Sequence, residues 1–168
     1  MNLLRRFILL TSLAVLFHGC GYSLAVRNTV IPSAQTVDVR MFANRTYQPN
    51  IDAELRQALV NELLSRGEKV VPEPADFIIS GEIAALKVDP AAFSAVDEAM
   101  LYTIVLEVHA ELTDRRSGKV VWKGAETIRQ GYPANDDLAL QRNSHSAAVS
   151  AACAKAARLL VVKMNQSF

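Results

Sequence analysis

Apolar and polar residues alternate in the segments 36–42 and 102–113, and this period of two predicts β-strands. Two more strands are predicted, one from the Ile and Phe content of 76–88 and one from its position directly after a short turn. The predicted strands span residues 36–42, 76–88, 102–113 and 119–130. A loop around Asp89-Pro90 is expected after the second strand, and Gly81 within it indicates a bulge or a close approach of the backbone. The short turn at 114–118 makes the last two strands an antiparallel hairpin.

Two other segments follow a helical period. Apolar residues at steps of three and four predict an amphipathic helix over 51–66, with Asn50 as its N-cap and Gly67 as its stop. A final Ala-rich helix is predicted from Asp136 or Asp137 to Met164. The apolar stripe expected on it consists of Leu138, Ala148, Ala152, Leu159 and Val162.

The order of these elements predicts the fold class. Strand, helix, strand, strand, strand and helix form an α+β domain, because each element must bury its apolar side. We expect a small mixed or antiparallel four-stranded sheet with two helices packed on one face. A domain of this size buries about 70% of its surface, so its core needs neither metal nor disulfide.

The first 19 residues differ in composition from the rest of the chain. Two Arg precede an apolar run from Phe7 to Phe17. As a helix this run is roughly 16 Å long, which is too short to cross a hydrocarbon core of about 30 Å. The layout is therefore that of a secretion signal and not of a transmembrane helix.

Gly19 followed by Cys20 resembles a bacterial lipobox. The resemblance implies that Cys20 becomes the mature N-terminus and carries S-diacylglycerol and N-acyl chains. Gly21 in place of Asp implies export to the outer membrane. Secretion with an incidental cysteine is the alternative. The predicted parts are a lipoprotein signal at 1–19, an acylated lead segment at 20–35 and a single α/β domain at 36–168.

Composition narrows the function classes. The chain has 168 residues, 51% of them apolar, with 18 Lys and Arg against 17 Asp and Glu, which excludes a disordered chain and gives no basic excess for nucleic acid. Two Cys cannot form a disulfide framework. If Cys20 is acylated, Cys153 is left as a small buried residue, and a redox role for it is the lesser alternative.

Charge is segregated along the chain. Residues 20–114 hold 7 basic and 14 acidic residues, whereas residues 115–168 hold 9 basic and 3 acidic residues. A cationic patch for a phosphate-bearing lipid is therefore predicted on the last hairpin. Its members are Arg115, Arg116, Lys119 and Lys123. The alternative is that Glu107 and Glu111 lie opposite these cations and neutralise them.

No catalytic constellation is found in the sequence. His109 falls on the polar face of a strand, and no Cys or carboxylate pattern predicts a metal site or a cofactor. Ser144 and His145 are adjacent, yet adjacent residues on a helix point about 100° apart. We therefore predict that the chain is not an enzyme, and a hydrolase that uses Ser144 and His145 is the weak alternative.

Several short motifs in a fixed order carry a family resemblance. They are Cys20-Gly21-Tyr22-Ser23-Leu24, the segment 39–46, the helix 51–66 ending in Gly67, the segment 75–81, the strand 102–112 with its hairpin, and the Ala-rich last helix. Together they cover the mature chain nearly from end to end. In their order and spacing they resemble the lipopolysaccharide-assembly lipoprotein family, LptE.

This resemblance implies a function without covalent chemistry. A member would be anchored at the periplasmic side of the outer membrane, would plug and help assemble the β-barrel protein LptD, and would take part in lipopolysaccharide delivery to the outer leaflet. Direct lipopolysaccharide binding by the cationic patch is a hypothesis from charge placement alone. The alternative is an accessory lipoprotein of another envelope lipid-transport machine.

Overall fold

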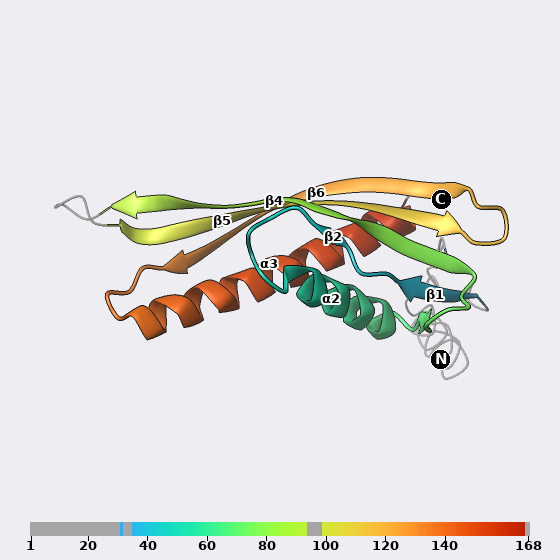
Figure 1. The fold of residues 1–168 in the computed structure, drawn as a ribbon, viewed down its shortest axis with the longest axis horizontal. Helices are drawn as coiled ribbons and strands as arrows, with labels where there is room; N and C mark the ends of the chain where they lie inside the picture. The colour runs from blue at the N-terminus through green and yellow to red at the C-terminus, as the bar shows by residue number, and fades with distance from the viewer. Residues whose placement is uncertain (1–30, 32–34, 94–98, 167–168) are drawn as a thin grey trace, which may run out of the picture.

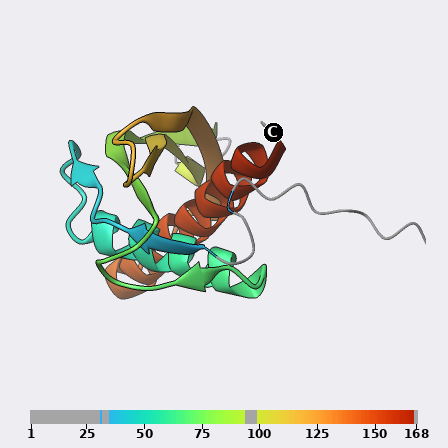
Figure 2. The same ribbon diagram turned by 90° about the vertical axis from the view of Figure 1, so that its right-hand side faces the viewer.

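Two helices lie on the same face of a mixed β-sheet (Figure 1, Figure 2). The structure is a computed structural model, and it describes residues 31, 35–93 and 99–166. Its elements are β1 (Thr36–Val39), β2 (Ala43–Asn44), α2 (Ile51–Ser65), β3 (Lys69–Val70), β4 (Phe77–Phe93), β5 (Ala99–Asp114), β6 (Val120–Pro133) and α3 (Leu138–Gln166). The predicted α+β class, with two helices on one face of a mixed sheet, is confirmed.

In the described part of the chain the sheet has six strands instead of the predicted four. Its order is β3-β1-β4-β5-β6, and β2 pairs with β4 beside this path. The short strands β1, β2 and β3 make parallel pairs, whereas β4, β5 and β6 form a long antiparallel meander. The extra strands β2 and β3 have two residues each, which is too short for a period of two to be visible.

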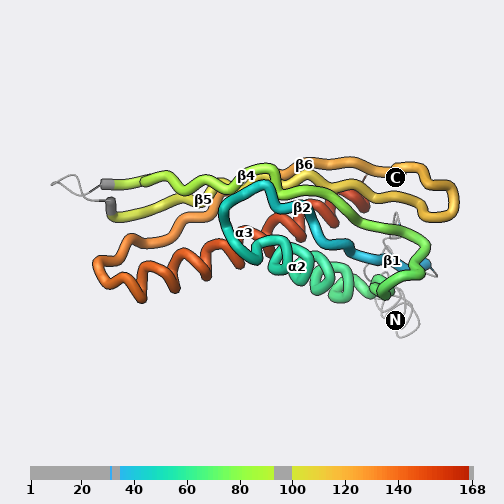
Figure 3. The backbone as a smooth tube through the Cα atoms, in the orientation of Figure 1, coloured from blue at the N-terminus to red at the C-terminus, as the bar shows by residue number. Residues whose placement is uncertain are grey.

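Strand β4 corrects the prediction of a loop around Asp89-Pro90. The strand continues through both residues to Phe93, and Pro90 lies opposite Tyr102 of β5. Figure 3 shows the path of β4 beside β5. Among the described residues β1 and β2 pair with β4 only as far as Ile83, so beyond this point one side of β4 is a free edge. Proline is tolerated there because its missing N–H has no partner to satisfy.

Gly81 marks a close approach of neighbouring groups, as the sequence predicts. A Cβ at this position would lie 2.1 Å from the carbonyl oxygen of His109 and 2.7 Å from the ring of Phe42. The bulge, the other reading of this glycine, lies further along β4, between Ile83 and Ala85. Gly81 therefore allows the buried Phe42 ring to pack directly on the β4–β5 backbone.

Helix α2 presents Ile51, Leu55, Leu59 and Leu63 to the core, all at most 1% exposed. The predicted cap is wrong in its mechanism. Asn50 has a left-handed backbone and makes no side-chain capping bond, and only its carbonyl accepts the N–H of Glu54. The predicted stop is confirmed, since the helix ends at Ser65 and Gly67 is left-handed at φ 83°.

Helix α3 is capped by Asp137, whose Oδ1 accepts the N–H groups of Ala139 and Leu140 at 2.7 and 3.1 Å. The predicted stripe is only partly right, because Leu138 is 72% and Leu159 40% exposed and Val162 is half-buried. The buried face consists of Ala148, Val149, Ala152, Cys153, Ala156, Ala157, Leu160, Val161 and Met164. Small residues line it because they let the helix approach β6 and α2 closely.

An ion pair joins α3 to the covered face of the sheet. Glu126 of β6 is 8% exposed, and its Oε1 lies 2.6 Å from Nζ of Lys163. We predict that Lys163→Met lowers the free energy of unfolding by about 2 kcal/mol, because it leaves a buried carboxylate without its cation. Urea unfolding measures this loss, and the double variant with Glu126→Gln should recover most of it. A double variant no more stable than Lys163→Met would contradict the role of the pair.

Candidate functional site

The four predicted patch residues fall into two groups. Arg115, Arg116 and Lys119 are exposed in the turn between β5 and β6, at the end of the molecule where β1 begins (Figure 1). Lys123 lies within β6, directly opposite Glu111 in register, and its Nζ is 3.3 Å from the Glu111 carboxylate. The alternative prediction, that an acid on the neighbouring strand neutralises the cation, therefore holds for Lys123. Glu107, the second acid named in that alternative, lies opposite Thr127 of β6 and not opposite a cation.

Asp114 organises the basic turn. Its Oδ1 accepts the backbone N–H groups of Arg116 and Ser117 at 2.8 and 3.0 Å, and its own N–H donates to the carbonyl of Lys119 at 2.9 Å. Gly118 supplies the left-handed residue of the turn at φ 68°. These bonds close the backbone into a fixed loop that carries three cations.

Asp76 connects this turn to the first strand. Its carboxylate accepts both the backbone N–H and the hydroxyl of Thr36 at 2.9 Å, and its carbonyl accepts the N–H of Arg115 at 2.9 Å. The backbone N–H of Thr36, its hydroxyl and the charge of Arg116 lower the pKa of Asp76 below its ordinary value of 3.8. The carboxylate form of Asp76 therefore holds β1 against the basic turn.

This shift predicts a pH dependence. Since the pKa of Asp76 is lower in the folded chain, its contribution to stability is full above about pH 5 and is lost as the pH falls through 3.8 to the lowered pKa. We expect Asp76→Asn to be less stable than the natural chain at pH 6, and this difference should shrink below pH 3.8. Urea unfolding at a series of pH values measures the difference, and a gap that stays constant down to pH 2.5 would contradict the prediction.

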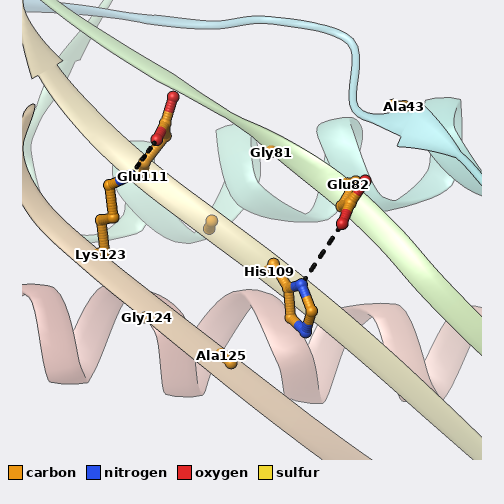
Figure 4. A pocket seen from close by; sticks show the side chains of 9 residues that line it. Ala43, Gly81, Glu82, His109, Glu111, Lys123, Gly124 and Ala125 are labelled. Carbon is orange, nitrogen blue, oxygen red and sulfur yellow. Dashed lines mark ion pairs between the residues drawn. The ribbon is translucent and has the colours of Figure 1, made fainter.

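A shallow hollow of about 540 Å³ lies on the sheet face opposite the helices, and Figure 4 shows the side chains that line it. His109 of β5 stands between two acids, with Nδ1 3.5 Å from Glu82 and Nε2 3.1 Å from Glu107. Beside it, the pair of Lys123 and Glu111 crosses from β6 to β5. These residues make the face a charged surface whose acids and bases pair with each other across the strands.

His109 lies on the polar face of its strand, as predicted, but its two acidic neighbours were not predicted. Glu82 reaches His109 through the β4–β5 register, which a single strand pattern does not reveal. The alternation of Glu107, His109 and Glu111 along one strand was the only signal available. Among the described residues, no group of three or more His, Cys, Asp or Glu is arranged to hold a metal ion.

Ser144 and His145 face different neighbours. The hydroxyl of Ser144 accepts a hydrogen bond from the Asn135 amide at 3.1 Å. The His145 ring packs edge-on against Tyr132, with ring centroids 5.7 Å apart. The two side chains thus do not form the nucleophile and base pair that a hydrolase needs.

The predictions for the two cysteines differ in what the structure says of them. Cys153 is 1% exposed, and burial raises the pKa of its thiol to about 12, so it is a packed side chain and not a reactive one, as predicted. Cys20, the predicted acylation site, lies outside the described residues. Among the described helices, none combines the length and the apolar character needed to cross a membrane.

The arrangement of sheet and helices is shared with solved bacterial lipoproteins. Rare lipoprotein B from Shewanella oneidensis is 15% identical, with 79% of this chain and 95% of that chain covered and a TM-score of 0.57. A minor lipoprotein from Acinetobacter baumannii is 10% identical, with 79% and 91% covered and a TM-score of 0.58. A putative lipoprotein from Caulobacter crescentus is 18% identical, with 75% and 89% covered and a TM-score of 0.55. The fold class is thus one that small bacterial lipoproteins use.

The amino-acid sequence identifies the family of the chain more narrowly than the fold does. No curated protein sequence matches the chain. The family model described as LptE, lipopolysaccharide-assembly, matches residues 34–164. The chain belongs to this family, and the resemblance carried by the sequence motifs is confirmed. At the level of the family it is a lipopolysaccharide-assembly lipoprotein of the Gram-negative envelope.

Proposed function

We propose that this chain is an outer-membrane lipoprotein, acylated at Cys20, that plugs and helps assemble the β-barrel LptD and takes part in lipopolysaccharide delivery to the outer leaflet. The observation that carries the proposal is the family match, which spans nearly the whole folded domain. The proposed division is a signal at 1–19, an acylated lead segment at 20–35 and one domain at 36–168.

The dimensions of the molecule support a plug. Strands β4, β5 and β6 have 17, 16 and 14 residues, which correspond to roughly 45 to 55 Å at about 3.3 Å per residue. The apolar band of a transmembrane barrel is about 25 Å tall. A body as elongated as that in Figure 1 extends past this band when its long axis follows the barrel axis.

The uncovered face of the sheet supports the same proposal. Large barrels have polar interiors, and a plug must meet them with polar groups. Glu82, His109, Glu111 and Lys123 supply such groups, and Lys123 pairs with Glu111 across the strands. This surface offers both donors and acceptors of hydrogen bonds.

The proposed role needs no catalysis. A plug acts by occupying space and by contacting its partner and its cargo, so no nucleophile, general base or cofactor is required of it. We propose that the chain is not an enzyme. The separate environments of Ser144 and His145 support this view.

Copurification tests the proposal directly. The full-length chain, tagged at its C-terminus and expressed at native level, is extracted in detergent and its partners are identified by mass spectrometry. We expect a stoichiometric β-barrel protein of the LptD kind. Recovery without any barrel partner would overturn the proposal, and recovery with a phospholipid-transport assembly would establish the alternative lipoprotein function.

The lipopolysaccharide-binding part of the proposal gives a separate prediction. We expect replacement of Arg115, Arg116, Lys119 and Lys123 by Gln to weaken binding of purified lipopolysaccharide at least tenfold in 50 mM salt, where exposed charges act over the longest range. Because Lys123 is paired with Glu111, Lys123→Gln alone should change the affinity less than twofold. Titration with fluorescent lipopolysaccharide measures both, and an unchanged fourfold variant would remove these residues from lipid binding.

A further inference from the structure

The basic turn and the start of the folded domain lie at the same end of the molecule. Thr36, the first residue of β1, and Arg115, in the turn, both bind Asp76 at 2.9 Å. Figure 1 shows β1 beginning beside the β5–β6 turn, at the right-hand end of the view. The chain that arrives from Cys20 therefore enters the domain next to three exposed cations.

The length of the connection limits how far this end can move from a bilayer. Ile31 is 1% exposed and belongs to the core, so at most ten residues, and thus eleven Cα-to-Cα steps, lie between the packed domain and Cys20. Fully extended, they span about 38 Å. Helix α3 alone, with 29 residues, is about 43 Å long. An anchor at Cys20 thus holds the end that carries the turn within about 38 Å of the membrane, whereas the opposite end can lie farther away.

Exposed charge distinguishes the two ends. Within the described part of the chain, the side chains of Arg115, Arg116 and Lys119 make no ion pair, although Arg116 acts on Asp76 through its charge. The carboxylates nearest to them are occupied, since Asp76 accepts bonds from Thr36 and Asp114 accepts bonds from the turn backbone.

The opposite end is acidic at its tip. Asp89 of β4 and Asp136 and Asp137 before α3 are exposed there, with Lys87 and Arg142 further along the same elements. An anionic surface attracts the basic turn and repels this tip. Charge and tether therefore favour the same orientation.

We propose that Arg115, Arg116 and Lys119 are a docking surface for the phosphates of anionic phospholipids in the leaflet that holds the anchor, so that the end of the domain that carries the β5–β6 turn faces this leaflet. This inference rests on the proposed acylation of Cys20. It assigns the three unpaired cations to the bilayer that carries the protein. Each cation near such a surface changes the ratio of docked to undocked protein about fivefold, and three change it about a hundredfold at low salt.

The test uses the full-length lipoprotein with a fluorescent label at a single introduced cysteine. Ser117→Cys places the label in the basic turn, and Asp136→Cys places it at the opposite end. The thiol of Cys153, with its pKa of about 12 and 1% exposure, does not compete for the label. Energy transfer to an acceptor on lipid headgroups reports the distance of each label from vesicles of phosphatidylcholine, with or without 30% phosphatidylglycerol or lipid A.

We expect transfer from the turn label to rise with phosphatidylglycerol and transfer from the Asp136→Cys label to stay low. Arg115→Gln, Arg116→Gln and Lys119→Gln together, or 0.5 M salt, should abolish the rise. The matched control Arg129→Gln, Arg142→Gln and Arg158→Gln removes the same charge elsewhere and should preserve it.

Two results would overturn the docking surface. One is equal transfer from the turn label with and without phosphatidylglycerol, and the other is a rise that lipid A produces and phosphatidylglycerol does not, which would leave the turn with lipopolysaccharide binding only. In both cases energy transfer is measured on protein that cosediments with the vesicles. A chain that fails to cosediment lacks the anchor, so failure of the proposed acylation is seen separately.

Discussion

Gly81→Ala is expected to lower the free energy of unfolding by about 3 kcal/mol. The new methyl group would lie 2.1 Å from the carbonyl oxygen of His109, a backbone atom held by the β4–β5 ladder. It would also lie 2.7 Å from the buried Phe42 ring, which packs among the core residues between β1 and β4. Strand and ring must both shift, and forced shifts in a packed core cost about 1–3 kcal/mol or more. Urea unfolding followed by circular dichroism measures the loss.

Gly131→Ala is the matched control. It lies in β6 of the same sheet, and a Cβ there would meet its nearest neighbour, the carbonyl oxygen of Tyr102, at an ordinary 3.8 Å. This variant should be as stable as the natural chain or gain up to about 0.5 kcal/mol, because alanine loses less entropy on folding. If both variants lost the same stability, steric contact at Gly81 would not be the cause.

Cys20→Ala is expected to abolish acylation and with it stable attachment to the membrane. Each buried acyl methylene contributes about 0.8 kcal/mol, so three chains together hold the protein almost irreversibly. The variant should incorporate no labelled palmitate and should either keep its signal or be found away from the outer membrane. Palmitate labelling and mass spectrometry of the mature N-terminus measure the change.

Cys153→Ala controls for any general effect of losing a cysteine. It removes a buried thiol that burial keeps unreactive, so labelling at Cys20 should continue at the natural level. Labelled palmitate in Cys20→Ala, or its absence from Cys153→Ala, would show that the anchor has been assigned to the wrong residue.

The long elements of the fold could be predicted because each carries its own periodic pattern. Strand β5 alternates from Tyr102 to Thr113, and α2 repeats Ile51, Leu55, Leu59 and Leu63 at four-residue steps. Strands β2 and β3 could not be predicted, because a strand of two residues shows no period. Each is a strand only because it pairs with a neighbour, β2 with β4 and β3 with β1. Pro90 lies in a strand because it occupies an edge, and edges are set by the tertiary arrangement.

Helix α3 shows why a hydropathy pattern alone misplaced a face. Large apolar residues such as Leu138 and Leu159 dominate such a pattern, yet both are exposed, and alanines form much of the buried side. The size of the side chains decides which face of the helix is buried, because a face of small side chains packs more closely on the sheet than a face of large ones. The sequence identified this segment as a helix, but which face of it is buried depends on neighbours that are distant in sequence.

The candidate site was likewise predictable from the sequence only in part. The sequence placed Arg115, Arg116, Lys119 and Lys123 together because they lie within nine residues. Cross-strand register then separated them, since Lys123 pairs with Glu111 while Arg115, Arg116 and Lys119 lie in the turn and make no ion pair with any residue that the structure describes. Proximity of the turn to Thr36 depends on Asp76, forty residues away from that threonine, and no local pattern reveals it.

The burial of Cys153 has a consequence for the biogenesis of this lipoprotein. Oxidising enzymes of the cell envelope act on thiolates, and an exported chain exposes its sulfur to them until it folds. Once α3 docks, the pKa of about 12 leaves almost no thiolate at neutral pH, and the sulfur becomes inaccessible. Folding speed thus sets the interval in which crosslinking to another chain can occur, and a variant that slows docking of α3 would accumulate as mixed disulfides without any change at its surface.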